Sequence, residues 1–123
     1  MALKGQRGQS TVEFALVLPL VVILMMALLQ AGLLLRDQLV LTAAAREGAR
    51  EAAVTADRGR IERAVNRAAP GLEVEVRVDR SPKRGDPVTV EVSGPPTRLP
   101  LVGAMVSGML LDSTATMRVE KAG

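Results

Sequence analysis

The chain has no Cys, His, Trp or Tyr, and Phe14 is its only aromatic residue. Without Cys and His, the sequence excludes disulfide scaffolding, thiolate or imidazole metal sites and Cys or His nucleophile–base chemistry. A core without aromatic side chains must be built from Val, Leu, Ala, Ile and Met. The composition therefore predicts no catalytic, metal or cofactor site.

The charge is also close to balance, at +3 from 16 basic and 13 acidic residues that are mixed along the chain. A surface that binds a nucleic-acid backbone needs clustered Lys and Arg, usually with stacking aromatics when the ligand is a single strand. The sequence therefore predicts no nucleic-acid partner.

What the chain does have is a long apolar run, Phe14 to Leu35, which is 22 residues without a formal charge. A membrane-spanning helix needs about 20 such residues. Pro19, Gln30 and Gly32 interrupt the run, but a membrane helix tolerates them, since neighbours re-satisfy the backbone and a buried Gln can bond across helices. The rest of this 123-residue chain is too small to surround such a run as a buried core helix.

A secretory signal peptide is an alternative, because Ala43-Ala44-Ala45 contains the small-x-small pattern of a cleavage site. The run is longer than the usual apolar region of a signal peptide, and Arg36 to Gln38 separate it from those alanines. Membrane lipid is therefore the first predicted partner.

Helical periodicity continues past Arg36, so one helix is expected from Thr11 to about Val54. Small residues share one of its faces, which suits close packing: Ala45, Gly48, Ala49 and Ala52. A glycine inside a helix costs about 1 kcal/mol relative to alanine, so Gly48 predicts close approach of a sheet or of a neighbouring subunit. Asp57 is expected to cap a second helix, 58–68, which Pro70-Gly71 ends.

The period then changes from 3.6 to 2, which predicts three strands. Valines alternate with polar residues over 72–79 and again over 88–93, and 81–87 reads as the loop of a hairpin. A third strand is expected over 114–120. Residues 99–111 are compatible with a short apolar helix or with a loop that lies on the sheet, and the pattern leaves both open.

The junction before the apolar run carries a motif. Gly8 follows a short basic segment, and Glu13 and Phe14 stand at the start of the run, where an unpaired carboxylate costs several kcal/mol if it is drawn into lipid. This arrangement resembles a prepilin, in which a Gly precedes the cleaved bond and a Glu follows five residues after it. The resemblance implies cleavage between Gly8 and Gln9 by a prepilin peptidase, with Glu13 and Phe14 serving assembly.

The wider pattern is more specific. The sequence VEFALVLP at 12–19, followed after the apolar run by AAAREGAR at 43–50, resembles the TadE-like minor pilins and pseudopilins of the tight-adherence (Flp) pilus. The resemblance covers about residues 7 to 54. It implies a single-pass protein of the bacterial cytoplasmic membrane, with its N-terminus in the cytoplasm, whose partners are the peptidase, other pilin subunits and the pilus assembly machinery.

We therefore expect an α+β protein: a leader over 1–8, a transmembrane helix over 9–35 and an extracytoplasmic pilin-like domain over 36–123. In this domain the long helix would pack its small-residue face on a three-stranded antiparallel sheet. The expected function is assembly of the pilus. The alternative is a signal-anchored membrane protein that keeps residues 1–8 and whose outer domain binds a partner without entering a filament.

Overall fold

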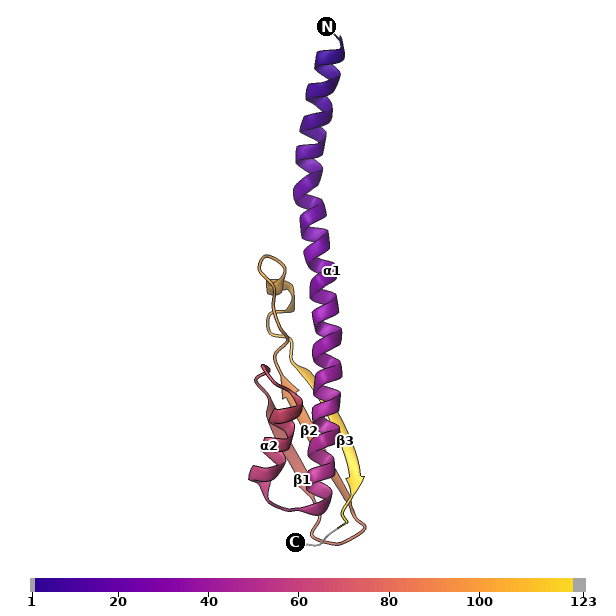
Figure 1. Ribbon diagram of the computed structural model, residues 1–123, viewed down its shortest axis with the longest axis vertical. Coiled ribbons are helices and arrows are strands. Elements are labelled where there is room, and N and C mark those ends of the chain that lie inside the picture. Colours follow the sequence, from indigo (N-terminus) through magenta and orange to yellow (C-terminus); the bar gives the residue numbers. More distant parts are fainter. Residues whose placement is uncertain (1, 121–123) are drawn as a thin grey trace.

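The computed structural model describes residues 2–120, with side chains from Gly8 onward, so the side chains of Lys4 and Arg7 in the expected leader lie outside the described residues. One helix, α1 (Ala2–Val54), dominates the molecule and projects far beyond a small domain (Figure 1). At 1.5 Å per residue, its 53 residues extend about 80 Å. The predicted end at Val54 is confirmed, whereas the helix begins at Ala2 and not at Thr11, because no proline interrupts residues 2–10.

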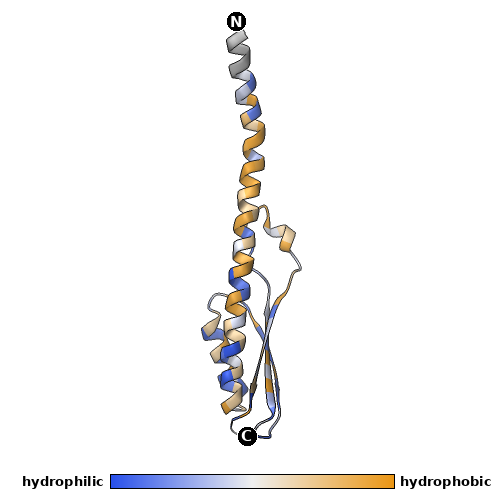
Figure 2. Ribbon diagram, turned by 90° about the vertical axis from the view of Figure 1, so that its right-hand side faces the viewer, coloured by the Kyte–Doolittle hydropathy of each residue, from blue (hydrophilic) through white to orange (hydrophobic). Residues whose placement is uncertain are grey.

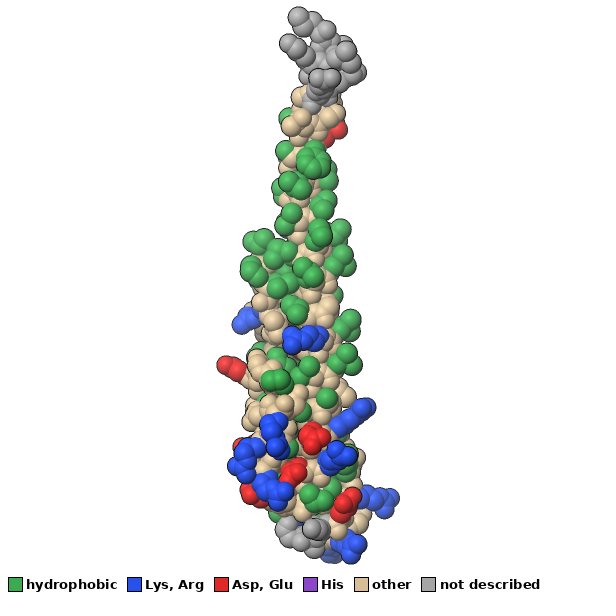
Figure 3. Space-filling model, in the orientation of Figure 1, with side chains coloured by type: hydrophobic (Ala, Val, Ile, Leu, Met, Phe, Trp, Pro, Cys, Tyr) green, Lys and Arg blue, Asp and Glu red, His purple; other side chains and the backbone are tan. Residues whose placement is uncertain are grey.

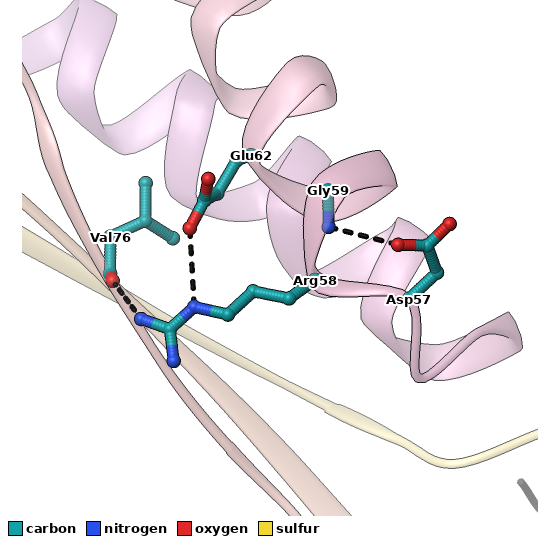
Figure 4. A network of polar contacts seen from close by, with 5 residues as sticks. All are labelled: Asp57, Arg58, Gly59, Glu62 and Val76. Atoms are coloured by element: carbon teal, nitrogen blue, oxygen red, sulfur yellow. Dashed lines mark hydrogen bonds and ion pairs between the residues drawn. The ribbon is translucent and has the colours of Figure 1, made fainter.

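A second helix, α2 (Arg58–Ala68), follows after a three-residue turn and packs beside the C-terminal end of α1. The Asp57 side chain accepts a hydrogen bond of 3.0 Å from the Gly59 backbone N–H, as an N-cap should (Figure 4). Ile61, Ala64 and Val65 form its buried face. The predicted bounds and cap of this helix are confirmed.

Arg58 ties α2 to the sheet. Its guanidinium donates to the Val76 carbonyl at 3.1 Å and contacts the Glu62 carboxylate at 3.1 Å (Figure 4). The ion pair is exposed, and such pairs contribute little to stability. The contacts of Arg58 therefore orient α2 relative to the sheet more than they stabilise the fold.

The sheet has three antiparallel strands in the order β1 (Glu75–Arg80), β2 (Pro87–Gly94) and β3 (Leu111–Arg118). The predicted α+β class with this sheet is confirmed. The valines at 88, 90 and 92 lie in the central strand and are fully buried against the helices. The opposite face carries polar residues such as Thr89, whose hydroxyl lies 3.1 Å from that of Thr116. The helices cover only one face of the sheet (Figure 2).

Two strand starts differ from expectation by three residues, and the other strand boundaries differ by one or two. β1 begins at Glu75 because its ladder with β2 ends at the pair Glu75–Ser93. Leu72 and Val74 precede the strand and pack on the core as irregular chain. β3 begins three residues earlier than predicted, at Leu111, which pairs with Gly94. In both cases the start of the strand coincides with the outermost residue pair of its ladder with β2.

The apolar segment between β2 and β3 combines parts of the two expected alternatives. It is a loop that contains one short 3₁₀ turn, η1 (Gly103–Val106), and it lies beside the middle of α1 instead of on the sheet (Figure 1). One face of the sheet is already covered by helices and the other is polar, so neither face offers an apolar surface on which this segment could pack.

Candidate functional site

The N-terminal part of α1 is bare. From Gly8 to Met25 every residue is exposed, and the most apolar 18-residue window of the helix has none of its residues buried. Figure 3 shows hydrophobic side chains along this shaft, and the Lys and Arg side chains that it colours lie below it. By length and composition, α1 is the single helix among the described residues that could cross a membrane.

The residues predicted to act in processing and assembly all lie on this bare end. Gly8 and Gln9 are exposed, and a Cβ added at Gly8 would meet nothing within 4 Å. Glu13 and Phe14 are also exposed, Phe14 by 66%. Within residues 8–120, the ion pairs join Arg50 to Glu47, Arg58 to Glu62 and Arg60 to Glu51, so none uses Glu13. The Glu13 carboxylate is therefore exposed and takes no part in these ion pairs.

The four predicted packing residues lie together at the other end of α1. Ala45, Ala49 and Ala52 are fully buried in the core cluster, and Gly48 faces both α2 and β2. A Cβ at Gly48 would lie 2.6 Å from Val65 Cγ2 and 3.0 Å from Val90 Cγ1. The partner of this face is the protein's own sheet and second helix.

A polar clamp on α1 was not expected from the sequence. Gln30, only 4% exposed, donates from Nε2 to the Thr97 carbonyl at 2.7 Å and accepts at Oε1 from the Leu99 N–H at 2.8 Å. Two turns along, buried Asp37 accepts from the Thr97 N–H at 2.7 Å through Oδ2. We call Gln30, Asp37, Thr97 and Leu99 the loop clamp, because together they fix the 95–110 loop to α1.

The sequence carried one signal for this clamp. Gln30 is the only strongly polar side chain in the charge-free run, and a polar group there requires a partner. The expected partner was another helix. The structure instead supplies the backbone of a loop about 67 residues further along the same chain.

The described residues contain no group of three or more His, Cys, Asp or Glu side chains placed to hold a metal ion. Taken together, the fold and the bare helix define a class of protein: an α+β protein with one apolar helix able to anchor it in a membrane and a small sheet domain packed on the far half of that helix.

Within this class, residues 8–50 of the chain match the family model described as TadE-like protein. The match confirms the resemblance drawn from the motifs at 12–19 and 43–50. It runs from Gly8 through the bare shaft and the Gln30 and Asp37 side chains to the packing face, and it ends before α2 and the sheet. Comparison with curated proteins and with solved structures gives no match.

Proposed function

We propose that this protein is a minor pilin or pseudopilin that takes part in assembling a tight-adherence, type IV-like pilus. The observation that carries the proposal is the TadE-like match over residues 8–50, which spans the proposed processing site, the apolar shaft and the first part of the packed domain. The family points to a protein associated with this pilus and to a structural role.

We propose that a prepilin peptidase cleaves the bond between Gly8 and Gln9. The bond lies on the bare end of α1, 22 positions before Gln30, the first buried residue of the described helix. A membrane-embedded enzyme could therefore reach it without disturbing the folded domain. Residues 9–35 would then anchor the mature chain, and 36–123 would lie outside the cytoplasm.

We propose that Glu13 contributes to subunit pairing after cleavage. Removal of residues 1–8 creates an α-amino group at Gln9, which is mostly protonated near neutral pH because such groups have a pKa of about 7.7 to 8.0. When helices leave the lipid and bundle, the Glu13 carboxylate of one subunit pairs with the Gln9 amine of its neighbour. The bare surroundings of Glu13 support this proposal, since no described residue of its own chain competes for it in an ion pair.

Ala45, Gly48, Ala49 and Ala52 have a different role in this proposal. Because their face is filled by α2 and the sheet, they hold the outer domain on the helix and leave subunit contacts to the bare shaft. A rigid connection of this kind lets force on the shaft reach the domain.

The alternative is a signal-anchored protein whose outer domain binds a partner without entering a filament. One measurement separates the two: the intact mass, or the N-terminal sequence, of the protein from its own host. A mature chain that starts at Gln9, together with an uncut Gly8→Leu precursor, supports the pilin. A chain that retains Lys4 and Arg7 supports the anchor, and a chain that starts near Arg46 indicates a secreted domain.

A further inference from the structure

The loop over 95–110 exposes an unusual amount of apolar surface for a segment outside a membrane helix. From Leu99 to Leu111 it carries no charge. Leu101 and Met105 are 77% and 79% exposed, and Met109 and Leu110 are exposed as well. Together these four side chains form an apolar tip that nothing in the described chain covers.

The tip lies at the level of the apolar shaft. Leu99 lines a shallow groove with residues of α1 between Met25 and Leu33, and the loop rises beside the middle of the helix (Figure 1). Above Met25, the shaft free of the loop runs only from Phe14 to Leu24, which is about 16 Å at 1.5 Å per residue.

This length decides where the loop sits. The hydrocarbon core of a bilayer is about 30 Å thick, so the free shaft crosses only about half of it. The span is completed by residues 25–35, which bring the apolar run to about 33 Å. The loop is held to this stretch by Gln30, and Leu99 lies beside it, so a bilayer that surrounds residues 25–35 also surrounds the tip.

Irregular backbone enters lipid only if its polar groups are satisfied. In this loop Pro95, Pro96 and Pro100 have no N–H to satisfy, and the clamp takes the N–H groups of Thr97 and Leu99. Five more N–H groups bond within the loop, at 2.7 to 3.2 Å: those of Val102, Gly103, Met105, Ser107 and Met109. At least seven of the thirteen backbone N–H groups of the loop thus have a hydrogen-bond partner within the protein.

Two charges mark the water side of the tip. Arg98 precedes it in the loop and Arg36 ends the apolar run of α1, and both are exposed. Long basic side chains near the end of a span reach to the headgroup layer. Leu101 also holds a φ of +66°, a conformation uncommon for a bulky residue. Its strained backbone places an apolar side chain on the surface of the tip.

We infer that the apolar tip of the 95–110 loop inserts into the outer leaflet beside α1 and is a second membrane-embedded element of this protein, which fixes the depth of the helix. The partner of the tip is the acyl-chain region of the lipid. The inference rests on the membrane anchoring in the proposed function, and not on cleavage or pilus assembly.

The natural absence of cysteine allows a direct test with the full chain in phosphatidylcholine vesicles, because each introduced Cys is the only site for a fluorescent label. Labels at Met105→Cys and Leu110→Cys are compared with Ile23→Cys in the shaft and Thr114→Cys on the exposed sheet face. One quencher is a nitroxide on the lipid acyl chain and the other is aqueous iodide.

We expect the labels at 105 and 110 to lose most of their fluorescence to the lipid nitroxide, as at 23, and to resist iodide, unlike the label at 114. Quenching of 105 and 110 by iodide to the extent seen at 114 would overturn the inference. Protection from both quenchers that fades on dilution would overturn it too, and would place a second copy of the chain on the tip. If the label at 23 is not quenched by the lipid nitroxide either, the proposed membrane anchoring is wrong. This result distinguishes a failure of the anchoring from a failure of the loop insertion alone.

Discussion

Gly48 of α1 lies so close to Val65 of α2 that a Cβ at position 48 would stand 2.6 Å from Val65 Cγ2. Valine has a stiff side chain that cannot swing away. The contact explains why a residue unfavourable in helices occupies the middle of this one, and it fixes how near α2 and the central strand approach α1.

Gly48→Ala is therefore expected to destabilise the domain. Overpacking costs about 1 to 3 kcal/mol, and removing a helix glycine returns about 1 kcal/mol, so the net loss reaches about 2 kcal/mol. Thermal unfolding of the full chain in detergent, followed by circular dichroism, measures it. Gly32→Ala, where an added Cβ meets nothing within 4 Å, is the matched control on the same helix.

A second variant makes this prediction specific. Val65→Ala removes the methyl group that the new Cβ would strike, so Gly48→Ala should cost less in that background than in the wild type. Equal costs in both backgrounds would show that crowding against Val65 is not the cause.

Asp57→Ala is expected to lower the free energy of unfolding by about 1 kcal/mol, because it removes the side-chain acceptor that caps α2. The measurement is the same melt. Asp79→Ala, an exposed acid in β1, changes the charge equally without touching a cap and should melt like the wild type. If the two variants melt alike, the cap does not contribute as the geometry indicates.

Gln30→Leu is expected to loosen the 95–110 loop without unfolding the sheet. It leaves the Leu99 N–H and the Thr97 carbonyl unsatisfied, which costs about 1 to 3 kcal/mol for a buried group. Amide hydrogen exchange at Leu99 should therefore rise by about 5- to 150-fold. Gln38→Leu, which removes only the exposed bond to the Asp112 carbonyl, is the control and should leave Leu99 unchanged.

Glu13→Ala is expected to be inserted and cleaved normally but poorly recovered with partner pilins or in sheared pilus fractions. In a poorly hydrated bundle an uncompensated partner charge costs about 3 to 5 kcal/mol, whereas a first-turn helix charge is worth only about 0.3 to 1 kcal/mol. Glu73→Ala, an exposed acid just before the sheet, should be recovered like the wild type. Normal recovery of Glu13→Ala would show that the carboxylate acts only within its own helix and does not pair with a neighbouring subunit.

The sequence by itself determined the parts of this protein that depend on local chemistry. A charge-free run of 22 residues requires an apolar helix, Asp57 and Pro70 delimit α2 through capping and the loss of a donor, and alternating valines indicate strands. The small residues at 45, 48, 49 and 52 indicated a packing face, because only close approach explains a glycine there.

Tertiary structure alone decided where the strands end and where the 95–110 loop lies. A strand extends only as far as it pairs with a neighbouring strand, so β1 begins opposite Ser93, 18 positions away in sequence, and β3 begins opposite Gly94. The loop is held by Gln30 and Asp37, which lie 60 or more positions from the backbone groups that they bind. Periodicity indicates which side of an element is apolar, but not which distant polar group will satisfy a given donor. Here that pairing holds the loop beside the apolar part of α1.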